Sequence, residues 1–274
     1  MQNLYTSNFK FNICHTFCNR AIGTWNLMSA GESSGISISE TTLTELNLLE
    51  IKQRHPTKVY IQKFSQQEEG KRTGADWEWW IGSNSQWLGI RVQAKRLKEK
   101  NSLSYSSFDH SNKYGKQVDM LIANAHKDRL YPMYCFYNSG YIKSFSSRWN
   151  CSSFPQQENL LGCSIADAFT VRNILNQKNI KDFSDTLSSI SYPWHCIVCC
   201  QCFLRRSGYT DSLPGRAASF IQHNMSGELS EEIQFIREEP PRYVQRLLQG
   251  EATDEEELPE GISYLFVNQE IEGE

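Results

Sequence analysis

The stretch of residues 73–97 most constrains the fold, because it reads as two adjacent β-strands joined by a short polar turn. In residues 75–81 the odd positions are apolar, whereas Asp76 and Glu78 share the opposite face, since successive side chains of a strand alternate between faces. Residues 82–86, which contain glycine, serine and asparagine, are typical of the loop that closes a hairpin.

The second half of this stretch carries a complementary set of polar groups. The even positions of residues 87–97 are apolar, so Gln93 and Lys95 project together on the other face. Pairing the two strands could bring a carboxylate, an amide and an ammonium group onto one surface. A metal-dependent site that cleaves phosphodiesters needs such an arrangement.

The overall composition is that of a globular protein. The chain has 274 residues, 39% of them hydrophobic, and can bury one large core. A membrane span is not expected, because no run of about 18 apolar residues occurs, and the first residues do not resemble a signal peptide. Nine cysteines, an odd number without a small-domain framework, favour reduced thiols and a cytoplasmic location.

Charge is distributed unevenly along the chain. Residues 228–274 carry 14 Asp+Glu and 3 Lys+Arg, which leaves 17 acidic and 25 basic residues in residues 1–227. A basic body suits a polyanionic partner. The acidic end is either a solvated tail or a shield for that basic surface, and both interpretations stay open.

The order of predicted elements suggests an αβββαβ core. Helices are expected over residues 8–30, 37–54 and 115–128, and strands over residues 57–65, 75–81, 87–97 and 131–138. Later expectations are a helix over residues 164–177, a buried strand within 193–204, short helices around Pro240-Pro241 and a strand over 262–267. The predicted units are an N-terminal helix and linker (1–36), the core (37–140), a helical and strand extension packed on the core (141–250) and an acidic tail (251–274).

The helix of the predicted core contains the first candidate acid. Ser37 and Glu40 fit a capping box, with Ser37 as the N-cap. Glu45 has Leu48 and Leu49 three and four positions on, so it lies on a largely apolar part of the helix. A carboxylate in such a place is costly unless it meets a cation, a metal or a donor, which makes Glu45 a candidate functional residue.

Two cysteine clusters raise the alternative of a zinc site. Cys14 and Cys18 flank His15 in the first helix, and Cys196 and Cys199 have the spacing of half a zinc site, with Cys202 nearby. Neither cluster has a matching second half. Packing as small hydrophobic residues is the simpler interpretation of both.

Together these residues resemble the PD-(D/E)XK nuclease superfamily, in the variant with glutamine in place of the second acid. The resemblance rests on Glu45 in a helix, Asp76 in the second strand and Gln93-Ala94-Lys95 in the third. The runs GADWEWW and WLGIRVQAKRL look close to a bacterial family of uncharacterised proteins placed in that superfamily. The resemblance implies a restriction-endonuclease-like α/β fold, with a mixed central sheet flanked by helices and a C-terminal α+β extension.

The resemblance also implies roles for the candidate residues. Asp76 and the carbonyl of Ala94 would bind Mg²⁺ or Mn²⁺, and Glu45 would hold a metal-bound water or a second ion. Lys95 would orient the attacking water or offset charge on the phosphate. Gln93 supplies a neutral oxygen, which predicts weaker metal binding than an acid would give. Additional candidates are Glu78, on the same strand face as Asp76, and Gln117, at the start of the following helix.

These expectations lead to two functional hypotheses. The first is metal-dependent hydrolysis of nucleic acid, preferably DNA, in a role that the family's habits associate with phage defence. The second is a catalytically inactive module that keeps the fold and binds nucleic acid or a protein partner. The basic residues expected to contact nucleic acid are Arg72, Arg96, Lys98 and Lys100. No membrane partner is expected, and a homodimer is left open.

Overall fold

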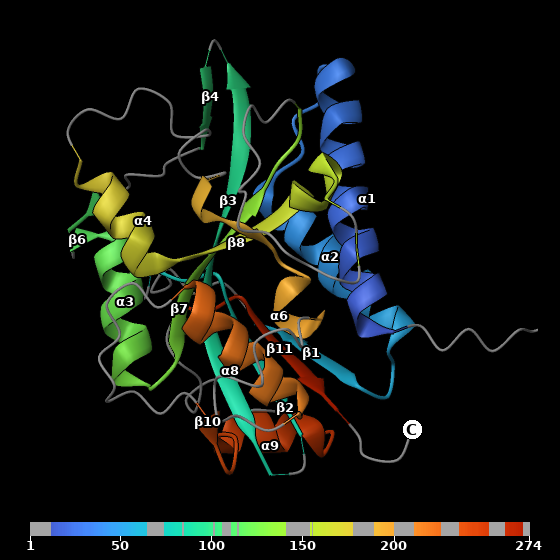
Figure 1. The fold of residues 1–274 in the computed structure, drawn as a ribbon, viewed down its shortest axis with the longest axis vertical. Helices are drawn as coiled ribbons and strands as arrows, with labels where there is room; N and C mark the ends of the chain where they lie inside the picture. Colours follow the sequence, from blue (N-terminus) through green and yellow to red (C-terminus); the bar gives the residue numbers. More distant parts are fainter. Residues whose placement is uncertain are drawn as a thin grey trace, which may run out of the picture.

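The computed structural model describes most of the chain. The described residues are 12–64, 74–83, 85–100, 102–105, 111–113, 115–140, 154, 156–177, 189–199, 211–225, 236–251 and 261–270. They form a mixed α/β protein with an open sheet flanked by helices (Figure 1). None of the helices in these ranges is both long and apolar enough to cross a membrane.

The central sheet combines parallel and antiparallel pairs. Its main path runs in the order β1 (Val59–Lys63), β11 (Tyr264–Gln269), β2 (Trp77–Gly82), β3 (Trp87–Lys100), β7 (Tyr131–Tyr137), β8 (Cys163–Asp167) and β9 (Tyr192–Pro193). Two short strands, β4 (Ser102–Tyr105) and β10 (Ile236–Arg237), also pair with β3, and β5 (Ser111–Asn112) pairs with β6 (Gly115–Lys116) separately. β2 is antiparallel to β3, whereas β3 and β7 are parallel.

Helices cover both faces of this sheet. The described helices are α1 (Ile13–Ser33), α2 (Glu40–Arg54), α3 (Gln117–Lys127), η2 (Glu158–Gly162), α4 (Ala168–Leu175), α6 (Cys196–Cys199), α8 (Leu213–Asn224) and α9 (Arg242–Leu248). On one face, Phe17 of α1 stacks on Trp79 of β2, with ring centroids 5.3 Å apart. On the other face, Tyr243 of α9 contacts Trp80, the next residue of the same strand.

The hairpin predicted from residues 73–97 is confirmed. β2 and β3 pair from Trp77 opposite Val92 to Gly82 opposite Trp87. The turn is closed by the N–H of Ser83, which donates to the carbonyl of Gln86 at 2.9 Å. The four tryptophans of the hairpin are buried, so they stabilise the core.

The most unexpected feature of the topology is the position of β11. This strand comes from the stretch expected to be an acidic tail, yet it lies between β1 and β2, antiparallel to the first and parallel to the second (Figure 1). Its residues alternate between two buried faces, and Leu265 and Val267 are fully buried. The consecutive strands β1 and β2 are therefore separated in the sheet by a strand that is distant from both in sequence.

Three local predictions differ from the structure. Helix α2 begins at Glu40 with Ser39 as its N-cap, whose Oγ accepts from the N–H of Thr42 at 3.0 Å, and the expected linker from residue 32 is helical as far as Ser33. The predicted helix over 164–177 is a strand up to Asp167, because Asp167 caps α4 and the preceding residues pair with β7. In the predicted strand of 193–204, residues 196–199 form a helical turn instead, and residues after 199 lie outside the described part.

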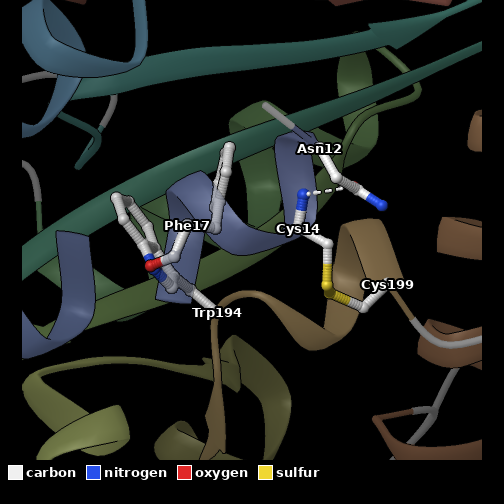
Figure 2. Close-up of a disulfide and its surroundings, with 5 residues drawn as sticks. All are labelled: Asn12, Cys14, Phe17, Trp194 and Cys199. Carbon is white, nitrogen blue, oxygen red and sulfur yellow. Dashed lines mark hydrogen bonds between the residues drawn. A yellow bond between two sulfur atoms is a disulfide. The ribbon is translucent and has the colours of Figure 1, made fainter. Parts of the chain in front are cut away.

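A disulfide links the start of α1 to α6. Figure 2 shows Cys14 joined to Cys199, with Cα atoms 5.2 Å apart across a sequence separation of 185. Beside the bridge, the indole N–H of Trp194 donates to the carbonyl of Phe17 at 2.7 Å (Figure 2). The expectation of reduced thiols is therefore wrong for this pair, although the four other described cysteines are buried thiols.

Breaking this disulfide is expected to destabilise the protein without abolishing the fold. The bridge closes a loop between residues 185 positions apart, and such cross-links contribute about 2–4 kcal/mol by restricting the unfolded chain. We therefore expect Cys14→Ser to lower the urea midpoint of unfolding, and dithiothreitol to lower that of the wild type equally. Dithiothreitol added to Cys14→Ser should cause no further decrease, and a further decrease of similar size would contradict the assignment.

Candidate catalytic site at the edge of strand β3

Asp76 immediately precedes β2 and is held by both neighbouring strands. Its N–H donates to the carbonyl of Val92 at 2.8 Å, and its carbonyl accepts from the N–H of Ser263 at 2.7 Å. The carboxylate Oδ2 accepts from the N–H of Ala94 at 2.7 Å and from the amide of Gln93. The residue keeps some solvent contact, but its carboxylate is enclosed by protein. Burial raises the pKa of Asp76 to about 6, and the Ala94 N–H, the Lys95 charge and the Gln93 amide oppose that rise.

A second carboxylate binds β3 two residues after Ala94. Glu40, the first residue of α2, accepts the N–H of Arg96 on Oε2 at 2.9 Å. Ala94 and Arg96 are two residues apart in β3, so their N–H groups point to the same side, roughly 7 Å from each other. Because the pairing with β2 ends at Val92, these N–H groups have no β2 partner and are taken by the two carboxylates instead.

Lys95 lies between Ala94 and Arg96, whose N–H groups bind the two acids, and both negative charges act on its ammonium group. It is nine-tenths buried, and burial lowers the pKa of Lys95 from its ordinary value. The negative charges of Glu40 and Asp76 oppose that decrease. The structure therefore brings together one lysine and two acids at the position where β3 extends beyond β2.

Gln93 connects this group to helix α3. Its Nε2 donates to Asp76 Oδ2 and, at 3.0 Å, to the carbonyl of Ala94, while its Oε1 accepts from Nε2 of Gln117 at 2.8 Å. Gly74 makes this approach of α3 feasible. Its φ of +69° lies in the left-handed region, and a Cβ there would lie 2.4 Å from the carbonyl oxygen of Gln117.

Glu45 makes its described contacts with residues outside this group. Its Oε1 accepts from Nζ of Lys63 and from the hydroxyl of Tyr264, both at 2.6 Å. Those contacts lower the pKa of Glu45. Tyr264 pairs with Trp77 and so shares its face of the sheet, whereas Gln93 and Lys95 project from the opposite face. Burial, the contact with Glu45 and the Asp76 charge together raise the pKa of Tyr264, so Tyr264 lies within electrostatic reach of both acids.

Glu78, the additional candidate beside Asp76, forms part of a buried ion pair. Its side chain is 0% exposed and pairs with Arg91, which is 1% exposed. The hydroxyl of Tyr243 and the indole N–H of Trp80 also donate to Glu78, at 2.8 and 3.1 Å. These contacts give Glu78 a structural role beneath α9.

The basic residues expected to contact nucleic acid fall into two groups. The side chain of Arg96 is turned inward, with 7% of the residue exposed, and its Nη1 donates to Oγ of Ser37 at 2.8 Å. Arg72 and the side chains of Lys98 and Lys100 lie outside the described residues.

The oxygen atoms of this group are of the types that a divalent cation of the magnesium class prefers. Asp76, the carbonyl of Ala94 and Glu40 offer carboxylate and carbonyl oxygens, which Mg²⁺ and Mn²⁺ prefer. The described residues contain no cluster of three or more His, Cys, Asp or Glu suited to a metal. Mg²⁺ does not require one, because it keeps several waters and is commonly held by one or two carboxylates.

Zinc at the cysteine clusters is disfavoured, since the disulfide uses one cysteine of each.

Glu40 is the site residue that the sequence interpretation missed. The spacing of Ser37 and Glu40 suggested a capping box, which assigned the carboxylate a purely local partner. In the structure, Ser37 contacts Arg96 and Glu40 contacts the strand instead. A signal was present, because Ser39 is an equally suitable N-cap that places Glu40 in the first helical position, free to reach another element.

The fold and the site define a mixed α/β protein with two acids and a lysine at one strand edge. Comparison with known proteins adds a family to this description. The model of a family of unknown function (DUF6615) matches residues 13–271, and the chain belongs to that family. No curated protein and no solved structure matches the chain. Any assignment of activity therefore depends on the site itself.

Proposed function

We propose that this protein is a metal-dependent nuclease of the PD-(D/E)XK type with a restriction-endonuclease-like core, and that DNA is its preferred substrate. The observation that carries the proposal is the convergence of Asp76, Glu40 and Lys95 where β3 extends beyond β2. The hairpin and the following α3–β7 unit support the core assignment. The net positive charge of residues 1–227 supports a polyanionic substrate.

Each residue of the site has a role in this proposal. Asp76, Glu40 and the carbonyl of Ala94 would hold the cation, which supplies positive charge to polarise the phosphate and to ease deprotonation of water. Lys95 would orient the attacking water and offset the negative charge that develops on the phosphate. Its burial favours this role, because a charge in a poorly solvated position acts more strongly on its neighbours.

A catalytically inactive binding module is the second candidate. It is favoured by the two contacts of Gln93, whose amide nitrogen spans Asp76 and Ala94 where an acid would strengthen metal binding. This module would keep the fold and bind nucleic acid or a protein partner. The two candidates differ in one measurable property, which is turnover.

Purified wild-type protein is expected to nick or degrade plasmid DNA in the presence of Mg²⁺ or Mn²⁺ and to be inactive with EDTA. Lys95→Ala should reduce cleavage by on the order of 10²–10³-fold, the usual effect of removing a group that stabilises transition-state charge. Lys127→Ala is the matched control, because Lys127 is exposed at the opposite end of α3 from Gln117. It should cleave like the wild type.

Circular dichroism and urea unfolding should show that both variants are folded. Wild-type protein that is inert on DNA and RNA with both metals, but binds nucleic acid, would support the inactive module. Cleavage that persists in Lys95→Ala would assign the activity to other residues.

A further inference from the structure

The amide nitrogen of Gln93 occupies the place between the two oxygens best suited to a cation. Its Nε2 donates to Oδ2 of Asp76 and to the carbonyl of Ala94 at once. An amide NH₂ carries partial positive charge and has two donors, so it can satisfy both acceptors. In this orientation the Gln93 oxygen faces away from them, toward α3.

The second observation concerns Gln117, which holds the other end of that amide. Its Nε2 donates to Oε1 of Gln93 at 2.8 Å. Its own Oε1 is buried and has no hydrogen-bond partner among the described residues. A buried amide oxygen without a partner is costly and calls for an explanation.

We propose that Gln93 and Gln117 form a pair of amides that rotate together when a divalent cation binds, and that Gln117 is a positioning residue for the metal site. This inference rests on the proposed function. In the orientation seen here, Gln117 donates to Gln93 and Gln93 donates to Asp76 and Ala94. After both amides turn by half a rotation, Oε1 of Gln93 faces the cation, and its Nε2 donates to Oε1 of Gln117.

The chemistry of the amide group makes this exchange inexpensive. The oxygen and the nitrogen of a glutamine amide are nearly equal in size, so both orientations fill the same space. The hydrogen bond between the two glutamines is retained with its direction reversed. Oε1 of Gln117, which lacks a partner in the first orientation, gains a donor in the second, while Nε2 of Gln117 takes the buried position that Oε1 leaves.

A double-mutant cycle on Mn²⁺ affinity tests the proposal without any nucleic acid. Isothermal titration would compare wild type, Gln117→Met, Gln93→Glu and the double variant. Gln117→Met should weaken Mn²⁺ binding about tenfold, because the rotated Gln93 would bury an unsatisfied donor. In the Gln93→Glu background a carboxylate oxygen faces the cation in any orientation, so the same Gln117→Met change should have less than about a threefold effect.

Equal effects of Gln117→Met in the two backgrounds, or no effect with Gln93 present, would overturn the proposal. Urea unfolding of each variant checks that it is folded. If Gln117→Met does not fold, the side-chain amide signals of wild-type Gln93 and Gln117 in a ¹⁵N NMR spectrum provide the test. Both should shift on titration with Mg²⁺, and a Mg²⁺ titration that leaves the two amides unchanged would contradict the rotation.

A negative result in the metal titration and a negative result in the cleavage assay have different consequences. Wild-type protein that binds Mn²⁺ with the predicted coupling, yet cleaves no nucleic acid, would overturn the proposed nuclease activity and retain the amide pair. Wild-type protein that binds neither Mn²⁺ nor Mg²⁺ would overturn the amide pair.

Discussion

Glu40→Gln is expected to reduce metal-dependent cleavage by on the order of 10²–10³-fold, whereas Glu45→Gln should change it less than about threefold. The glutamine oxygen at position 40 can still accept the N–H of Arg96, so the start of α2 should remain in place. The substitution removes the negative charge of Glu40, which in the wild type favours the protonated form of Lys95. Glu45 instead bonds Lys63 and Tyr264, at the opposite face of the sheet from Lys95.

The measurement is the rate of plasmid cleavage over a range of Mg²⁺ concentrations. Glu45→Gln is the matched control, because the two acids lie on the same helix and the substitution is chemically identical. A larger loss of cleavage in Glu45→Gln than in Glu40→Gln would contradict the role of Glu40. It would instead assign that role to Glu45, the acid predicted from the sequence.

Glu78→Ala is expected to lower the free energy of unfolding by about 3–5 kcal/mol. The side chains of Glu78 and Arg91 are 0% and 1% exposed. Among the described residues, removing the carboxylate leaves the Arg91 guanidinium paired only with Asp128, at 2.9 Å, whose side chain is 41% exposed. It also removes the acceptor of the Tyr243 hydroxyl, which loosens α9 from the sheet.

An exposed ion pair provides the comparison for this effect. Glu45 and Lys63 have side chains 42% and 66% exposed, and such pairs contribute no more than about 1 kcal/mol. Urea unfolding of Glu45→Ala should therefore show a much smaller change than Glu78→Ala. Similar changes in the two variants would mean that burial does not govern the strength of the Glu78–Arg91 pair.

Local patterns in the sequence predicted the part of the fold whose contacts are themselves local. The alternation in residues 73–97 predicted the antiparallel hairpin, and with it the shared face of Asp76, Gln93 and Lys95. The side chains of a strand alternate between two faces, so a half-buried strand can be recognised from its sequence. A short turn then fixes which neighbouring strand it pairs with. The helix that ends at Arg54 was predicted for a similar reason, because Pro56 disfavours helical geometry at the preceding residue.

Features that depend on distant partners could not be predicted in the same way. A strand was expected over residues 262–267, but nothing local specifies that it pairs with Trp77 on one side and Lys63 on the other. Glu40 was assigned to a cap because its true partner, the N–H of Arg96, is 56 residues away. The Cys14–Cys199 bridge likewise joins residues whose spacing carries no signal.

The placement of β11 has a consequence for how the molecule is made. While a ribosome is still adding residues 264–269, the backbone of β2 that will face them has no partner, and neither has that of β1. The nascent chain must therefore leave β1 and β2 without this shared neighbour until residues 264–269 have been made. Because the N–H of Ser263 donates to the carbonyl of Asp76, a nascent chain that has not yet reached residue 263 lacks one of the hydrogen bonds that position this acid.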